Sequence, residues 1–198
     1  MNKDIFKNLF VLDMANNHQG DLKHASNIIN AHSKIVNEEK INGCIKFQYR
    51  NLKTFIHPNE KRKKSNKHTS RFLSTKMSED NLKKMADLVK INGLLTMTTP
   101  FDEESLELIE KFNIDIVKIA SCSATDWPLL KTASKLDKPL TSTSVNFSGK
   151  NYPEYFKDIE IEILNQVDYA VNLKRDKKLQ KPSKIVKIVN DEFITLRR

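Results

Sequence analysis

Five short apolar segments recur along the chain, and each has the length of a β-strand. Most are rich in β-branched or large apolar residues, as in strands that are buried on both faces. They are Leu9–Leu12, Cys44–Phe47, Leu94–Met97, Ile114–Ile119 and Pro139–Ser142. The pattern therefore predicts five strands before residue 143.

Between these strands, apolar residues recur at helical spacing behind a polar residue that can start a helix. The starting residues are Asp21, Ser78, Asp102 and Asp126. Each side chain can accept a hydrogen bond from a free N–H of the first helical turn, and Pro128 suits the first turn of the last helix. Gly43 and Gly93 follow two of these helices, where glycine forms a left-handed cap at the lowest cost.

Strands and helices that alternate at this spacing are typical of right-handed βαβ units, and hence of a parallel sheet. Only the long basic segment 49–77 interrupts the rhythm, and we interpret it as a loop. The sequence therefore predicts an α/β fold.

After Ser144 the pattern weakens. Residues 151–164 have the pattern of a helix, and residues 167–173 that of a sixth strand. Residues 184–189 and 192–196, joined by Asn190-Asp191, alternate like a terminal β-hairpin. We therefore divide the chain into residues 1–145, which form the parallel α/β part, and a basic tail over residues 146–198.

Composition supports a folded protein rather than a disordered or membrane-spanning one. The 198 residues include 38% hydrophobic and 30% charged residues. No apolar run approaches the ~20 residues of a membrane span. The first residues lack the apolar region and cleavage site of a signal peptide, so we expect a cytoplasmic protein. Cys44 and Cys122 each lie in an apolar stretch and are interpreted as small core residues.

The net charge of +9 is concentrated in two segments. Residues 53–71 and residues 174–198 each carry a net charge of +6, which leaves −3 on the rest of the chain. We interpret the basic run 61–67 as having no aromatic neighbours on which bases could stack. A solvated mobile loop is favoured over a phosphate- or polyanion-binding loop, and nucleic acid is a disfavoured partner.

Candidate chemistry gathers where the predicted strands end, because parallel α/β folds bind ligands at the carboxyl ends of their strands. Two lysines and several hydroxyls at this rim suit an anionic ligand rich in oxygen, such as a phosphorylated acid. The residues are Asp13, Lys46, Gln48, Thr99, Phe101, Lys118, Ser121, Ser142 and Thr143. Neither a GxGxxG nor a P-loop pattern is present, which disfavours dinucleotide and Walker-type nucleotide binding.

Four motifs at these strand ends resemble the sialic acid (N-acetylneuraminate) synthase family, which includes the legionaminate and pseudaminate synthases. They are Asn16–Asp21, Ile45–Gln48, Thr98–Ser105 and Lys118–Ser121. The resemblance covers about Phe10 to Ser144. It implies a (β/α)8 TIM barrel that condenses phosphoenolpyruvate with an N-acetylated sugar, assisted by a divalent metal (Mn or Mg). We therefore expect a partial barrel of five to six parallel strands with a divergent C-terminal tail.

The resemblance also implies roles for individual residues. Lys46 and Lys118 would bind the phosphoenolpyruvate anion, and Gln48 and Phe101 would line the sugar side. Asp13 becomes the candidate catalytic carboxylate. The phosphate would be held by hydroxyls at three places, namely Thr99, Ser121 and the stretch Ser142-Thr143-Ser144.

Each role has a structural alternative. A strand lysine such as Lys46 or Lys118 can instead form a structural ion pair, because an unpaired buried ammonium costs several kcal/mol. The hydroxyls of Thr99 and Ser121 can instead satisfy a strand end. His18 is expected to shape the first loop rather than to touch substrate.

The chain also departs from the family. Glutamate is usual where Asp13 stands, a carboxylate is usual where Ser123 stands, and the glycine expected after the fifth strand is absent. An eight-stranded barrel needs ~250 residues. The metal-binding histidines of the later strands have no counterpart, since no histidine follows His68, and residues 145–198 carry no motif of this family.

Three functional hypotheses follow. The first is a synthase-like protein of nonulosonic acid biosynthesis, active only when another chain completes the barrel and supplies metal ligands; catalysis by this chain alone is disfavoured. The second is a non-catalytic relative that binds a phosphorylated ligand or oligomerises with a full-length synthase; a homo-oligomer is a further possible assembly. The third is a polyanion binder that uses the basic segment and tail. An open sheet leaves unpaired edges. Three outcomes follow: a complementary chain completes the barrel, the tail hairpin covers the gap, or the protein is a truncated remnant.

Overall fold

The computed structural model divides the chain into two compact units, Met1–Ser142 and Thr143–Arg198. The structure describes residues 5–61, 66–142, 144–147, 150–167, 170, 175–178, 185–189 and 192–197. No helix within those ranges is long and apolar enough to cross a membrane.

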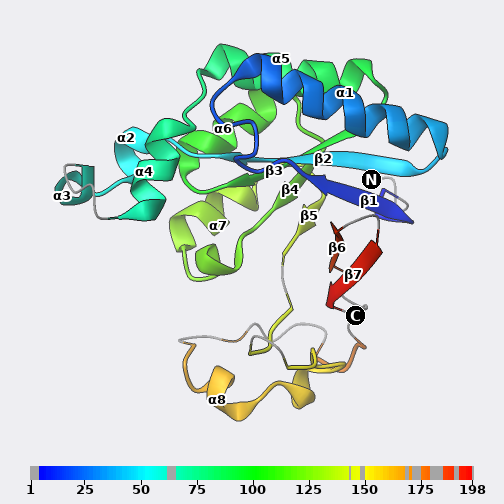
Figure 1. The fold of residues 1–198 in the computed structure, drawn as a ribbon. Coiled ribbons are helices and arrows are strands. Elements are labelled where there is room, and N and C mark those ends of the chain that lie inside the picture. Colours follow the sequence, from blue (N-terminus) through cyan, green and yellow to red (C-terminus); the bar gives the residue numbers. More distant parts are fainter. Residues whose placement is uncertain are drawn as a thin grey trace. The chain divides into compact units, whose positions relative to one another are not determined.

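The first unit is built on a five-stranded parallel sheet, as the alternating pattern predicts. Its strands follow each other in the order β1-β2-β3-β4-β5, and every neighbouring pair is parallel. The strands are β1 (Leu9–Asp13), β2 (Asn42–Tyr49), β3 (Leu95–Pro100), β4 (Ile116–Lys118) and β5 (Leu140–Thr141). Sequential order with helical crossovers is the arrangement of a (β/α)8 barrel, and the sheet is a partial barrel of this kind (Figure 1).

The four helices that the sequence predicts are present between the strands, and each begins behind the polar residue expected to cap it. They are α1 (Leu22–Glu38), α5 (Glu79–Ile91), α6 (Glu103–Lys111) and α7 (Trp127–Ala133). The side chains of Asp21, Ser78, Asp102 and Asp126 each accept a hydrogen bond from an N–H of the first turn. In Figure 1, α1 and α5 lie side by side over one face of the sheet.

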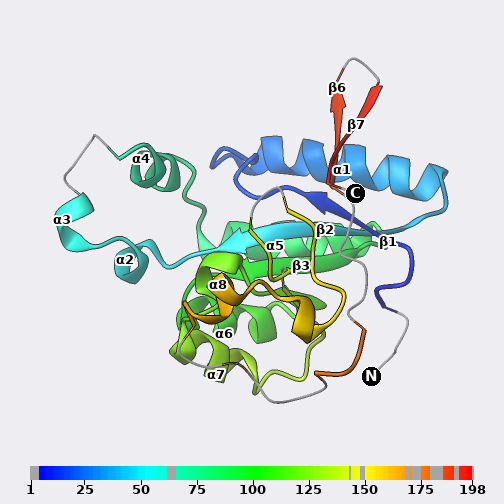
Figure 2. The ribbon, with the colours of Figure 1, turned by 90° about the horizontal axis from the view of Figure 1, so that it is seen from below.

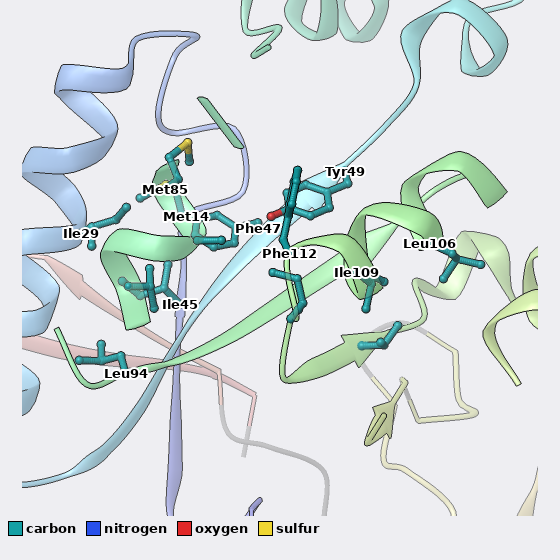
Figure 3. Close-up of a cluster of buried hydrophobic side chains, with 14 of the residues drawn as sticks. Met14, Ile29, Ile45, Phe47, Tyr49, Met85, Leu94, Leu106, Ile109 and Phe112 are labelled. Atoms are coloured by element: carbon teal, nitrogen blue, oxygen red, sulfur yellow. The ribbon is translucent and has the colours of Figure 1, made fainter. Parts of the chain in front are cut away.

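The main core lies between the sheet and its helices. Figure 3 shows aromatic and aliphatic side chains of β2, α5 and α6 packed together there, with Phe47, Tyr49 and Phe112 at the centre. A second, smaller cluster comprises Cys44, Met97 and Ile116, with Leu9 and Leu95 packed against it. Along each strand, the residues of this cluster alternate with those of the main core. The cluster therefore lies on the other face of the sheet, which is the inner face of the barrel.

The prediction that Gly43 forms a helix cap is wrong. Helix α1 ends earlier, and Lys40 adopts the left-handed backbone with φ 51°. Gly43 is the second residue of β2, where a Cβ would come within 2.8 Å of a Val36 methyl carbon. The residue is glycine because α1 packs closely on β2, not because the chain turns there. Gly93, with φ +80°, does end α5 as expected.

The basic segment 49–77, interpreted as a loop, instead contains three short helices. They are α2 (Leu52–Phe55), α3 (Pro58–Lys61) and α4 (Lys67–Ser74). Asn51 and Asn66 cap α2 and α4 through their side chains. Figures 1 and 2 both show these helices beyond the end of β2. Most of the basic run (residues 62–65) lies outside the described residues.

The loop after β1 is shaped by His18, as expected. The buried imidazole accepts a hydrogen bond from the Gly20 N–H through Nδ1 at 3.0 Å. Gly20 itself needs a glycine backbone, with φ +78°, and a Cβ there would meet the Ser74 carbonyl at 3.0 Å. This loop is therefore held against the end of α4.

The second unit contains little of the helix expected over residues 151–164. A 3-10 turn (η2, Phe156–Asp158) and a short helix (α8, Ile161–Leu164) stand there instead. The terminal hairpin is confirmed, with β6 (Ile185–Val189) antiparallel to β7 (Glu192–Arg197). Most of the expected sixth strand, residues 167–173, lies outside the described residues.

We expect the first unit to lose stability as the pH falls below the ordinary histidine pKa of about 6.5. Burial, and then the nearby His24, lower the pKa of His18, and burial lowers that of His32. Both groups therefore bind protons more readily in the unfolded chain, so acid favours unfolding. His18→Asn keeps an acceptor for the Gly20 N–H but cannot titrate in this range.

Urea unfolding between pH 5 and 8 measures the effect. The free energy of unfolding of His18→Asn should change less with pH than that of the unmodified protein, and His18→Asn/His32→Gln least of all. Equal slopes in all three proteins would contradict this account.

Candidate active site

The candidate residues of β2, β3 and β4 share the inner face of the sheet. Lys46 and Gln48 follow Cys44 at alternate positions of β2, and Lys118 follows Ile116 in the same way on β4. Gln48 stands beside Thr99 in the register of β2 and β3. Cys44 and Ile116 belong to the inner cluster. Side chains two or four residues further along the same strand lie on the same face, so Lys46, Gln48 and Lys118 face the barrel interior. The two lysines, Gln48 and Thr99 therefore converge on one face at one rim.

Lys46 forms an ion pair with Asp13 on that face. The two residues stand side by side in the register of β1 and β2, and Nζ lies 2.7 Å from Oδ2. The lysine side chain is only 9% exposed, whereas that of Asp13 is 53% exposed. The partner that has lost its water is therefore the ammonium, and the half-exposed carboxylate compensates it. Lys46 therefore forms the structural ion pair that was the alternative to ligand binding. Its ammonium still has further N–H donors for a ligand.

Lys118 and Thr99 occupy the centre of the rim. Lys118 is half-buried at the end of β4, where it stands beside Thr141 of β5. Thr99 is buried at the end of β3. A cation and a hydroxyl at adjacent strand ends can together hold a charged oxygen.

The remaining hydroxyls are placed less centrally. Ser121 is exposed and begins a 3-10 turn after β4 (η1, Ser121–Ser123). Ser142 is exposed, and its Oγ donates to the Ile119 carbonyl at 3.3 Å. This bond satisfies the end of the strand. Thr143 lies outside the described residues.

Gln48 and Phe101 belong to an aromatic cluster around Arg50, a residue that the sequence analysis did not single out. An Arg50 Nη donates to Gln48 Oε1 at 2.7 Å. The guanidinium carbon lies 4.0 Å from the ring centroid of Phe101, 4.4 Å from that of Phe72 and 5.7 Å from that of Phe55. Burial lowers the pKa of Arg50 to about 10, so the group stays cationic at neutral pH.

Two signals in the sequence pointed to this cluster. Arg50 continues the alternating polar series of Lys46 and Gln48. Phe55 precedes the basic run and Phe72 follows it, and no aromatic residue lies inside the run. Their convergence depends on how α2 and α4 fold back, which no local pattern encodes.

The described residues do not fit the divalent metal that the resemblance implies. They contain no group of three or more His, Cys, Asp or Glu side chains that could hold a metal ion. Chemistry proposed for this chain therefore rests on its lysines, amides and hydroxyls.

Two family models match parts of the chain. The model of the family described as telomere recombination matches residues 122–198. This range includes residues 145–198, which carry no sialic acid synthase motif. The chain is also 40% identical over 72 residues to a putative threonylcarbamoyl-AMP synthase of Methanocaldococcus jannaschii, covering 36% of this chain and 33% of that protein.

Other similar proteins have names from carbohydrate biosynthesis. The chain is 28% identical over 142 residues to N,N'-diacetyllegionaminic acid synthase of Campylobacter jejuni, covering 68% of this chain and 41% of that enzyme. The crystal structure of a putative spore coat polysaccharide biosynthesis protein E from Chromobacterium violaceum is 38% identical, with a TM-score of 0.68, and covers 80% of this chain and 45% of that one. The chain thus spans less than half the length of each of these three proteins.

The NeuB family model matches residues 38–146, which is more than half of the chain. This range contains Lys46, Gln48, Thr99 and Lys118, together with the cluster around Arg50, whereas Asp13 precedes it. The expected kinship with sialic acid synthases is confirmed, and the chain belongs to the NeuB family.

Proposed function

We propose that the first unit is the phosphoenolpyruvate-binding part of a sialic acid synthase-like enzyme in the biosynthesis of surface carbohydrates. The observation that carries the proposal is the convergence of Lys46, Gln48, Thr99 and Lys118 on the inner face at the carboxyl ends of β2, β3 and β4. The family match and the legionaminate synthase relative support the same activity.

Phosphoenolpyruvate carries a carboxylate and a phosphate, so it needs cations and fixed donors on one side. Lys46 and Lys118 supply the charge, and Thr99, with Ser121, supplies hydroxyls. Asp13 holds the Lys46 ammonium in place and supplies its counter-charge. Gln48 and Phe101 would face the N-acetylated sugar, whose carbonyl then meets the enol carbon. Such positioning is the main contribution of these residues to the rate.

We further propose that another chain completes the barrel for turnover and supplies the metal ligands. The strands at the two ends of the sheet order are β1 and β5, and Phe10, Val11 and Leu140 on them are exposed. Exposed apolar side chains on such strands favour pairing with further strands. The cytoplasmic location remains our prediction.

A second candidate function concerns the C-terminal part. The match of residues 122–198 and the threonylcarbamoyl-AMP synthase relative favour descent of this part from an adenylate-forming enzyme. Within the second unit, a cavity of about 430 Å³ is lined in part by Asn146, Glu154, Asp158 and Glu160. Two of these carboxylates already pair with ammonium groups, Glu154 with Lys178 and Glu160 with Lys150. We propose that the amine of an amino acid takes the place of one of these ammonium groups in the cavity.

The ion pair of Lys46 and Asp13 should stabilise the fold measurably. Asp13→Asn leaves a buried ammonium without its counter-charge, and we expect a loss of about 1–3 kcal/mol, less than for a fully buried pair because Asp13 is half-exposed. Lys46→Met removes the buried charge itself and should cost less.

Urea unfolding of both single variants and the double variant gives the coupling energy. Asp13→Asn should have little further effect on stability in the Lys46→Met background. Additive losses would show that the pair contributes nothing.

Phosphoenolpyruvate should bind the chain through the two lysines. Isothermal titration should show affinity reduced about tenfold or more in Lys46→Met and in Lys118→Met, because each removes a charge-assisted hydrogen bond of about 1.5–3 kcal/mol. The exposed Lys131 on α7 provides the control, since Lys131→Met removes the same charge away from the rim. Equal affinity in all four proteins, or no binding to the unmodified chain, would refute the proposal.

Titration with threonine tests the second candidate. Binding should survive Lys46→Met and Lys118→Met and be weakened by Glu154→Gln/Asp158→Asn. Threonine binding that depends on the rim lysines, or that is absent, would argue against an amino-acid site in the second unit.

A further inference from the structure

We propose that Arg50 is a positioning residue that locks the Gln48 carboxamide in one orientation, so that the rim presents an N–H donor and selects a sugar substituent with an acceptor oxygen. This inference rests on the proposed function, because it assigns Gln48 to the sugar side. It concerns the substrate class that this part of the site accepts.

The orientation of Gln48 follows from the chemistry of its partner. Arg50 has only N–H donors, so the Gln48 atom 2.7 Å from its Nη must be the carbonyl oxygen. The amide nitrogen consequently points away from the guanidinium. An isolated glutamine at this place could present either atom, because the two ends of a carboxamide have nearly the same shape.

The guanidinium is itself held on several sides. Phe101 comes from the end of β3, and Phe55 and Phe72 come from α2 and α4. The three rings also pack on one another, with Phe55 5.8 Å from both Phe72 and Phe101 between centroids. Such contacts between a cation and aromatic faces gain strength where water is excluded. The helices between β2 and α5 therefore fix Arg50, and Arg50 fixes Gln48.

A fixed donor determines what can bind beside it. The carbonyl oxygen of an acetamido group accepts a hydrogen bond from the Gln48 amide, whereas the ammonium of an unacetylated amino sugar has only donors. The arrangement thus favours an N-acetylated sugar over the free amine at this position. Thr99, next to Gln48 in the register, can serve as either donor or acceptor and adds no such preference.

The first test needs no ligand. In a ¹⁵N-labelled chain, the Gln48 side-chain amide signals are identified by their loss in Gln48→Glu. The amide protons should show no contact with the Phe101 ring in the unmodified protein. In Arg50→Met such contacts should appear as the carboxamide turns, and Arg50→Lys, which can still donate to Oε1, should suppress them. Contacts with the ring in the unmodified protein, or identical spectra in Arg50→Met, would overturn the proposal.

The second test uses N-acetylmannosamine and mannosamine as probes of the phosphoenolpyruvate-loaded chain. Arg50→Met should lower the affinity for N-acetylmannosamine about three- to tenfold, which corresponds to one hydrogen bond. The affinity for phosphoenolpyruvate should not change. Arg50→Lys should restore most of the affinity. A parallel loss of phosphoenolpyruvate binding would show that Arg50 merely supports the fold. If the chain binds no phosphoenolpyruvate, the proposed function fails, while the ligand-free spectra still decide the role of Arg50.

Discussion

A buried ammonium in a strand has to be compensated, and in this chain the compensation of Lys46 organises the start of the sheet. Its side chain pairs with Asp13 at 2.7 Å, and its backbone carbonyl accepts hydrogen bonds from the N–H groups of Met14 and Ala15. The contacts of Lys46 thus fix three things together. They are the compensation of its charge, the register of β1 on β2 and the path of the loop after β1. Moving β1 by one residue would turn Asp13 to the other face and leave the lysine unpaired.

The same constraint explains how Asp13 can stand where the resemblance leads us to expect glutamate. The shorter side chain reaches Lys46 because the two residues are direct neighbours in the sheet. Electrostatic compensation and ligand binding are not exclusive roles for this lysine. The pair with Asp13 fixes the direction of the ammonium, and a fixed donor is what recognition of an anion requires.

Two family models match the chain, and their matched ranges share residues 122–146. The shared stretch contains η1, α7 and β5, and the boundary between the two compact units lies within it. Sequence reasoning described residues 146–198 as a divergent tail, because it compared them with the motifs of one family alone. The hairpin in this part was nevertheless predicted, since alternation around Asn190-Asp191 is a local signal.

Local patterns were sufficient for the strands, for the caps of α1, α5, α6 and α7, and for the side chains at the carboxyl ends of the strands. Alternation, helical spacing and capping act between residues close in sequence, so the sequence alone is enough to recognise them. They could not show that Gly43 is required by Val36, that Asp13 is the partner of Lys46, or that the rings flanking the basic run close around Arg50. Those contacts join residues far apart in the chain, and packing between separate elements decides them.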